Sequence, residues 1–277
     1  MVRTSSQRSM GSGQVMAGKS NVVVVTGGAK GMGLACTLKF LGEGAEVFSL
    51  DNDQKALDEL KSSHPQPNLH THKVDVSSEQ QVSALAAEVS RNFSAIKALV
   101  NCAGIQTYGT VTETSEELWD RTFNVNVKAM FLTAKHFVPM LKNNGGGAIV
   151  NISSVQSEVA QKGVVAYASS KGAINMLTKA LAVDLAEFQI RANAVLPGSV
   201  DTPMLRGAAE LFKGEKSVDE ILTEWGKSHP LGRVAKTSEV ADLVAFLCSD
   251  SAVFITGACM TIDGGLTAQV PVVIPEK

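Results

Sequence analysis

The chain has 277 residues, of which 44% are hydrophobic and 19% charged, and its formal net charge is −2. This balance is typical of one large folded domain with a sizeable core, and it excludes a chain that is mostly disordered. The sequence has no block of like charges and no apolar run of membrane-spanning length, so neither a nucleic acid nor a membrane is an expected partner.

The cysteine and histidine content argues against a cross-linked or metal-bound framework. Four cysteines are scattered along the chain, at Cys36, Cys102, Cys248 and Cys259. This pattern is typical of reduced residues in an intracellular protein, so we expect a cytoplasmic location. His70 and His72 could form a metal pair, but two imidazoles without further ligands nearby are better interpreted as exposed strand residues. We therefore predict no metal site.

Residues 1–20 differ in composition from the rest of the chain. They are rich in Ser, Gly and Met, and they contain basic but no acidic residues. No apolar segment is present, so they do not form a secretory signal. The composition is compatible with a mitochondrial presequence, whereas the Gly-Ser-Gly interruption favours a disordered tail or an expression remnant.

The first fold signal is a strand, a glycine-rich turn and a helix in immediate succession. Residues 21–26 are continuous and β-branched, which predicts a buried strand; the turn 27–33 and a helix through Leu41 follow. Glycines in such a turn let the backbone approach a pyrophosphate at the positive end of the helix. The alternative is a turn without a ligand. Asp51 argues against it, because it ends a second predicted strand, 45–50, where it can accept from ribose hydroxyls.

The alternation of strands and helices continues to the end of the chain. After the second strand, the sequence predicts a helix over 54–62 capped by Asp53, a strand over 69–74 and a helix from the capping box Ser77–Gln80 to about Arg91. A strand over 96–100, a long helix opened by Thr114–Glu117, a strand over 148–152 and a helix that carries Tyr167 follow. The last predicted elements are a strand over 190–195, a mostly helical excursion over 203–228, a helix over 239–247 and a strand over 258–262.

This alternation predicts an α/β fold, a single Rossmann-type doubly wound parallel sheet of about seven strands flanked by helices. We assign residues 21–266 to one dinucleotide-binding catalytic domain and residues 267–277 to a C-terminal tail. The ligand crevice of such a sheet lies at the carboxyl ends of its strands. Six residues with suitable chemistry fall at or just beyond predicted strand ends: Gly27, Asp51, Asp75, Asn101, Ser154 and Pro197.

Tyr167 and Lys171 lie four residues apart at the start of a predicted helix, so they share one face. A free tyrosine has a pKa of about 10, and a fixed positive charge nearby lowers it. The pair is therefore a candidate acid/base device. Asn126 is a further candidate, because asparagine inside a helix has poor propensity; its plain interpretation is a side-chain hydrogen bond to the core.

With these residues in place, the chain resembles the short-chain dehydrogenase/reductase family, in its compact single-domain branch, from residue 21 to about 266. Thr26–Gly33 is similar to the family's TGxxxGxG turn and Asn101–Gly104 to its NNAG motif, although Cys102 departs from the second asparagine. Ser154 precedes Tyr167 by the family's spacing for the catalytic serine. Further matches are Asn126 in Val125–Val127 and the segment Pro197–Thr202.

The resemblance implies a catalytic tetrad. Tyr167 exchanges the proton of the substrate oxygen, and Lys171 lowers the tyrosine pKa and holds the nicotinamide ribose. Ser154 hydrogen-bonds the substrate oxygen, and Asn126 holds a water that relays protons. The resemblance also implies a cofactor set: Gly27, Lys30, Met32, Gly33, Asp51, Asp75, Val76, Asn101, Ala103, Gly104, Tyr167, Lys171, Pro197, Val200 and Thr202. We expect the substrate to contact Ser154, Gln156, Gln161 and Tyr167.

The choice of cofactor rests on two opposed charges. Asp51 favours NAD because it accepts from ribose hydroxyls and repels a 2′-phosphate, whereas Lys30 in the turn would favour NADP. We predict NAD as the cofactor. Several polar residues favour a sugar or polyol substrate: Gln106, Tyr108, Gln156, Gln161 and Lys162. The segment after Thr202 would suit an apolar one, because it supplies Met204, Leu205, Leu211 and Phe212.

We therefore expect an NAD-dependent oxidoreductase that acts on a small-molecule alcohol or carbonyl. The resemblance implies a homotetramer. The alternatives are an NADPH-dependent ketoacyl or other carbonyl reductase and a non-catalytic dinucleotide-sensing protein. Asp51 argues against the reductase, and the presence of both Tyr167 and Lys171 argues against the sensing protein.

Overall fold

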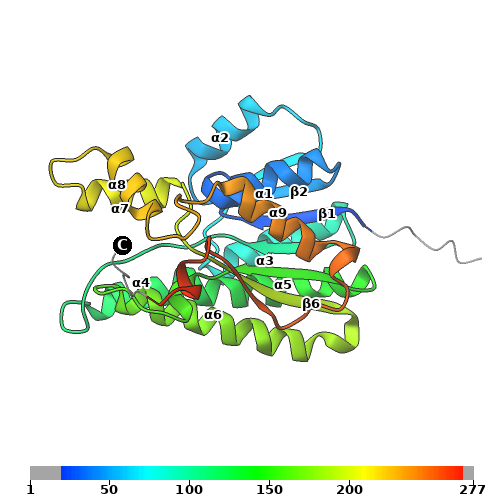
Figure 1. Cartoon of the computed structure of the whole chain (residues 1–277). Coiled ribbons are helices and arrows are strands. Elements are labelled where there is room, and N and C mark those ends of the chain that lie inside the picture. Colours follow the sequence, from blue (N-terminus) through cyan, green and yellow to red (C-terminus); the bar gives the residue numbers. More distant parts are fainter. Residues whose placement is uncertain (1–19, 271–277) are drawn as a thin grey trace, which may run out of the picture.

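The computed structural model describes residues 20–270 (Figure 1). Apart from Ser20, the predicted N-terminal tail lies outside the described residues, and so do residues 271–277 of the predicted C-terminal tail. Within residues 20–270, no helix is both long and apolar enough to cross a membrane.

One parallel sheet organises the described part of the chain. Its seven strands have the order β3-β2-β1-β4-β5-β6-β7, and every neighbouring pair is parallel. The strands are β1 (Val22–Thr26), β2 (Glu46–Asp51), β3 (Leu69–Lys73), β4 (Ala98–Asn101), β5 (Gly147–Ile152), β6 (Ile190–Pro197) and β7 (Cys259–Ile262). The predicted doubly wound sheet is confirmed. Its strand order reverses between β1 and β4, which is where a ligand crevice forms in such folds.

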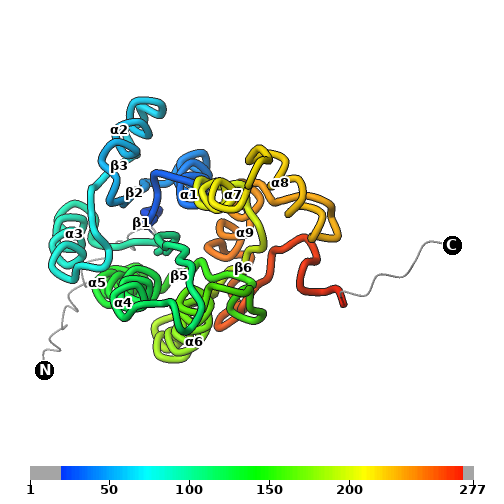
Figure 2. The backbone as a smooth tube through the Cα atoms, turned by 90° about the vertical axis from the view of Figure 1, so that its left-hand side faces the viewer, coloured from blue at the N-terminus to red at the C-terminus, as the bar shows by residue number. Residues whose placement is uncertain are grey.

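Helices cover both faces of the sheet (Figures 1 and 2). One face packs against α1 (Gly31–Gly42), α2 (Gln54–Ser63) and α9 (Thr237–Cys248), and the other against α3 (Glu79–Asn92), α5 (Ala129–Asn143) and α6 (Val165–Asp184). Strand β1 contributes to both cores, because alternate side chains point to opposite faces. Val23 and Val25 pack in the first core, and Val22 and Val24 in the second.

Three helices lie near the carboxyl edge of the sheet: α4 (Glu116–Phe123), α7 (Pro203–Phe212) and α8 (Val218–Gly226). Helices α7 and α8 form the predicted excursion after β6. They share a small apolar cluster of their own, which includes Ala209, Ile221 and Leu222. We call residues 203–226 the α7–α8 lobe.

Some local details differ from the sequence-based expectations. Asp53 caps α2 as predicted, but the caps of α3 and α4 are Ser78 and Ser115, one residue beyond the start of each predicted box. His70 is half-buried and not exposed as predicted, because its ring stacks on Phe48 with the ring centroids 4.6 Å apart.

The predicted long helix after residue 114 is interrupted. A π-helical segment, Asn124–Lys128, separates α4 from α5. Such segments insert an extra residue into the helical ladder and are frequent at functional sites. Here the segment contains Asn126, whose side chain is fully buried.

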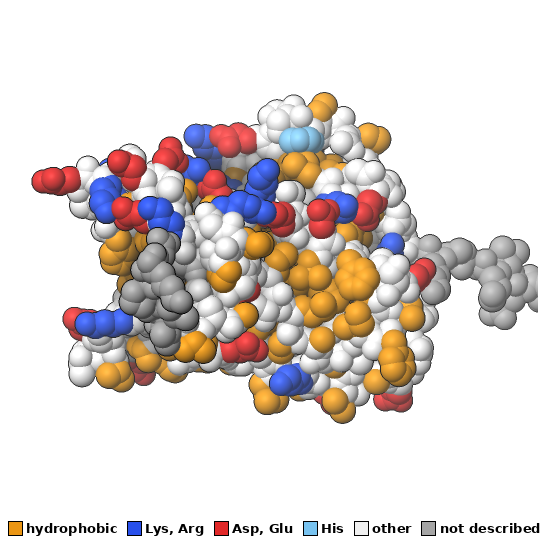
Figure 3. Space-filling model, viewed as in Figure 1, with side chains coloured by type: hydrophobic (Ala, Val, Ile, Leu, Met, Phe, Trp, Pro, Cys, Tyr) orange, Lys and Arg blue, Asp and Glu red, His pale blue; other side chains and the backbone are white. Residues whose placement is uncertain are grey.

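Hydrophobic side chains also gather on the outside of the molecule. Figure 3 shows such a patch on the face that carries α9. Phe246 in α9 is partly exposed, and Val253 and Phe254 in the following turn are largely or fully exposed. Exposed apolar patches of this kind mark interaction surfaces in soluble proteins.

Candidate active site

The turn between β1 and α1 is shaped by glycines that no larger residue could replace. A Cβ on Gly33 would lie 2.0 Å from the carbonyl oxygen of Gly27, so the start of α1 sits directly against the turn. Gly27 has a φ of 61°, and a Cβ there would lie 2.9 Å from the backbone of Ala103. No side chain therefore covers the backbone between the end of β1 and the amino end of α1. This arrangement fits a dinucleotide pyrophosphate.

A cavity of about 290 Å³ opens above this turn. Most of the residues predicted to bind the cofactor line it: Gly27, Lys30, Met32, Gly33, Asp51, Asp75, Val76, Ala103, Gly104 and Thr202. The predicted cofactor set omits its other lining residues, namely Gly31, Leu50, Asn52, Val74, Cys102, Ile105, Val125, Pro203 and Met204, of which Met204 was named only as a residue that would suit an apolar substrate. Most of them are sequence neighbours of the recognised motifs, and they could have been predicted on that ground.

A second cavity, of about 980 Å³, adjoins the first, because Met32, Thr202 and Met204 line both. All four predicted substrate residues, Ser154, Gln156, Gln161 and Tyr167, line it, together with Pro197 and Val200 from the cofactor set. Sequence reasoning missed Trp225, His229 and Thr267, which come from three separate segments and carry no motif.

Three predicted site residues line neither cavity. The side chain of Asn101 donates to Asn151 at 2.9 Å and accepts from Thr133 at 2.8 Å, so it joins β4, β5 and α5 within the core. Asn126 and Lys171 lie just below the cavity walls: a Cβ on Gly104 would be 3.3 Å from the Asn126 oxygen and 3.8 Å from the Lys171 ammonium.

Beside the end of β2, two acids, Asp51 and Asp53, surround the one lysine of the turn, Lys30. Lys30 pairs with Asp53, the cap of α2, which raises the pKa of Lys30 and lowers that of Asp53. The carboxylate of Asp51 accepts from the backbone N–H of Ala29 at 3.2 Å and from that of Asp53 at 3.1 Å. The lysine charge is thus already partnered, and Asp51 is fixed in place at the cavity wall.

Cys102 also lines the smaller cavity, at the position where the sequence departs from the family motif. It lies beside Cys36 of α1. Contact with Cys102 and burial both raise the pKa of the Cys36 thiol.

The side chains of Tyr167 and Lys171 are both buried at the start of α6. The Lys171 ammonium lies 5.4 Å from the centroid of the Tyr167 ring and donates to the backbone oxygen of Ile152 at 3.0 Å. Burial raises the pKa of Tyr167 to about 12, although a hydrogen bond with Ser154 opposes this shift. Burial also lowers the pKa of Lys171 to about 8.

These values correct one expectation. The sequence predicts that Lys171 lowers the pKa of Tyr167, whereas in the structure burial raises this pKa and the opposing contribution comes from Ser154. Within the protein alone, the tyrosine is therefore a neutral phenol at neutral pH and can act as a proton donor.

Asn126 connects three parts of the site. Its side-chain oxygen accepts from the Ile105 N–H at 2.8 Å. Its amide nitrogen donates to the Ile105 oxygen at 2.9 Å and to the Ser170 hydroxyl at 3.0 Å. These bonds fix the loop after β4 against α6, one residue away from Lys171. The plain interpretation of this asparagine, a side-chain hydrogen bond within the core, is confirmed.

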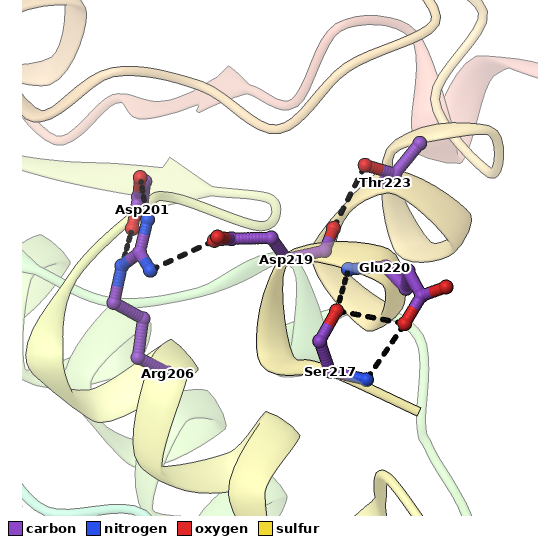
Figure 4. Close-up of polar contacts among 6 residues, drawn as sticks. All are labelled: Asp201, Arg206, Ser217, Asp219, Glu220 and Thr223. Carbon is purple, nitrogen blue, oxygen red and sulfur yellow. Dashed lines mark hydrogen bonds and ion pairs between the residues drawn. The ribbon is translucent and has the colours of Figure 1, made fainter. Parts of the chain in front are cut away.

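The α7–α8 lobe is tied to the end of β6 by a polar network (Figure 4). Thr202 caps α7. Arg206 of α7 makes two hydrogen bonds to Asp201, at 2.7 and 2.9 Å, and one to Asp219 of α8 at 3.0 Å. A capping box formed by Ser217 and Glu220 closes the start of α8. These hydrogen bonds hold the lobe beside the larger cavity, and Met204, Leu205 and Ala208 of the lobe line that cavity.

Comparisons with known proteins agree with this geometry. A family model described as "Enoyl-(Acyl carrier protein) reductase" matches residues 27–267. A curated relative, "Dehydrogenase/reductase SDR family member 6" of Aquarana catesbeiana, is 38% identical over 247 residues, which cover 88% of this chain and 96% of the relative. The chain belongs to the short-chain dehydrogenase/reductase family.

Two further members of the family are similar over nearly their whole length. The cyclopentanol dehydrogenase of Comamonas testosteroni is 39% identical over 253 residues, 90% of this chain and 97% of that protein. The solved structure of the aldohexose dehydrogenase of Thermoplasma acidophilum has a TM-score of 0.86 and 37% identity, and the match covers 93% of this chain and 98% of that chain. The chain is thus an oxidoreductase of CH–OH groups from a family that binds a nicotinamide dinucleotide.

A titration tests the raised pKa directly, because the chain contains only two tyrosines. In a Tyr108→Phe variant without cofactor, Tyr167 is the single phenol. At pH 11 a free phenol, with a pKa of about 10, is mostly ionised. We expect the phenolate absorbance of this variant to remain small at that pH, because burial, the main cause of the raised pKa of Tyr167, is unchanged by the substitution. Ultraviolet difference spectra measure it, with a Tyr108→Phe/Tyr167→Phe protein as blank. Half-ionisation at or below pH 10 would contradict the raised pKa.

Proposed function

We propose that the chain is an NAD-dependent dehydrogenase of secondary alcohols and their carbonyl counterparts, with a sugar or polyol as substrate. The observation that carries this proposal is the junction of the two cavities. Tyr167 and Ser154 line the larger one together with Pro197 and Val200 of the predicted cofactor set, while the glycine turn lines the smaller one. The nicotinamide ring, when bound, supplies the hydride chemistry.

In this proposal the chain's own residues manage the substrate oxygen. The neutral phenol of Tyr167 donates a proton to the oxygen when a carbonyl is reduced, and the phenolate accepts it when an alcohol is oxidised. Ser154 donates a hydrogen bond to the same oxygen and stabilises developing negative charge. The Lys171 ammonium stabilises the phenolate and binds the nicotinamide ribose. Asn126 holds the water that connects this pair to solvent.

The preference for NAD is supported by the charges at the adenosine end. Asp51 presents an acceptor to ribose hydroxyls, and a second acid, Asp53, already neutralises Lys30. A 2′-phosphate would meet two carboxylates and a lysine with an existing partner. NADP therefore fits this end of the cavity less well.

The substrate class is supported by the polar part of the larger cavity. Gln156 donates to Gln161 at 2.9 Å, and both amides line the cavity. Such amides match the hydroxyl groups of a sugar or polyol. Two similar proteins are named a cyclopentanol dehydrogenase and an aldohexose dehydrogenase, and these names are consistent with a small alcohol or sugar as substrate.

We also propose a homotetramer, and light scattering of the purified chain measures it. The exposed patch of Phe246, Val253 and Phe254 supports one contact surface. Met176 and Val183, which are exposed on α6, support a second. Two separate apolar surfaces are what a tetramer with two kinds of interface requires.

Replacement of the catalytic tyrosine tests the proposed activity. Tyr167→Phe keeps the ring and removes only the proton-exchanging oxygen. We expect NAD binding to survive while turnover falls by roughly a hundredfold to ten-thousandfold, the usual contribution of general acid–base catalysis. Steady-state kinetics on a panel of sugars, polyols and secondary alcohols measure the loss. Near-normal turnover of the variant would show that Tyr167 is not the acid/base.

Lys171→Met should impair both turnover and cofactor affinity.

Removal of one charge tests the cofactor preference. We expect wild type to have the higher kcat/KM with NAD. Asp51→Asn should weaken NAD, because charge-assisted hydrogen bonds become neutral ones, and should improve NADP, because repulsion is relieved. Asp75→Asn is the matched control: it lines the same cavity and should leave the ratio between the cofactors unchanged. A wild-type preference for NADP would overturn the assignment and make Lys30 the selecting residue.

A further inference from the structure

A tyrosine that the proposed mechanism leaves unused stands on the wall of the larger cavity. Tyr108 belongs to the loop after β4, and the loop is fixed on both sides of it. Ile105 is held by Asn126, and the Gly109 N–H donates to the Gly163 oxygen at 2.8 Å. Gly109 also pairs with Val164, directly before α6. The backbone therefore fixes Tyr108 relative to the start of the helix that carries Tyr167.

The ring of Tyr108 also contacts the α7–α8 lobe. It meets the ring of Phe212, the last residue of α7, edge to face, with the centroids 5.2 Å apart and the planes at 78°. Both rings line the larger cavity. This aromatic contact joins the fixed loop after β4 to the lobe, so Tyr108 is supported on two sides and loses little freedom when a substrate binds.

The hydroxyl of Tyr108 is the feature of this side chain that the contacts above do not explain. Among residues 20–270 no group hydrogen-bonds to it, and burial alone raises its pKa, so it is a neutral phenol at neutral pH. It lies close enough to Tyr167 that its charge, if it ionised, would raise the pKa of Tyr167. A neutral hydroxyl can donate and accept, and one that is half-buried beside the reacting centre is available to a ligand.

We propose that Tyr108 is a specificity-determining residue whose hydroxyl hydrogen-bonds to a second oxygen of the substrate, next to the oxygen held by Tyr167 and Ser154. The inference rests on the proposed dehydrogenase function and deepens it. The substrate class it names is an alcohol with a hydroxyl on the neighbouring carbon, as in a vicinal diol or polyol. No proton or electron is transferred through Tyr108, which remains a neutral phenol throughout.

Two alcohols that differ by one oxygen provide the test: cyclopentanol and cis-1,2-cyclopentanediol, each with NAD. The measured quantity is the ratio of kcat/KM for the diol to that for cyclopentanol. In Tyr108→Phe, which keeps the ring, we expect this ratio to fall roughly twofold to tenfold, the net worth of one neutral hydrogen bond. Phe212→Leu is the matched control. It keeps an apolar side chain against the Tyr108 ring and removes no oxygen, so both substrates should lose activity together and the ratio should stay at its wild-type value.

An unchanged ratio in Tyr108→Phe overturns the inference, and so does an equal fall in Phe212→Leu, since cavity shape would then be the cause. Wild type that oxidises cyclopentanol but not the diol overturns the inference and leaves the proposed dehydrogenase activity standing. Wild type that oxidises neither these alcohols nor the panel of sugars and polyols overturns the proposed function itself. The pH profile with cyclopentanol adds a second readout. Below pH 10, Tyr108→Phe should keep the wild-type profile, because Tyr108 is a neutral phenol in that range and does not hold Tyr167.

Discussion

The three hydrogen bonds of the Asn126 side chain connect most of the site. They hold the loop after β4 by both backbone groups of Ile105 and reach Ser170 on α6. That loop contributes Ala103 and Gly104 to the smaller cavity and Tyr108 to the larger one. The asparagine lies in a π-helical segment, a geometry that is frequent at functional sites. The cofactor side and the substrate side of the site thus share one anchor.

The pKa values of Tyr167 and Lys171 are both shifted towards the neutral forms, and burial is the main cause in each case. A site that excludes water makes charge expensive, and it also strengthens whatever interaction finally stabilises that charge. The fold therefore keeps Tyr167 protonated, as a proton donor, beside Lys171, whose ammonium can lose its proton near pH 8.

Sequence reasoning predicted the sheet, because a run such as Val22–Val25 specifies a buried strand by composition alone. It also predicted which residues gather at the strand ends. It missed features that depend on spatial neighbours distant in sequence. The pairing of Lys30 with Asp53 and the contact of Tyr108 with Phe212 join distant positions, and no periodicity encodes them. The raised pKa of Tyr167 was missed for the same reason, because burial is a property of the assembled fold.

The separate apolar cluster of the α7–α8 lobe affects how the substrate preference of such an enzyme can change during evolution. Ala209, Ile221 and Leu222 pack on each other and not within the two cores of the sheet. Substitutions inside the lobe therefore leave the folding of the sheet, and the placement of Tyr167 and Ser154, largely undisturbed. New substrate preferences can accumulate there by mutation while the chemistry stays constant, so the lobe is the natural starting point for directed evolution.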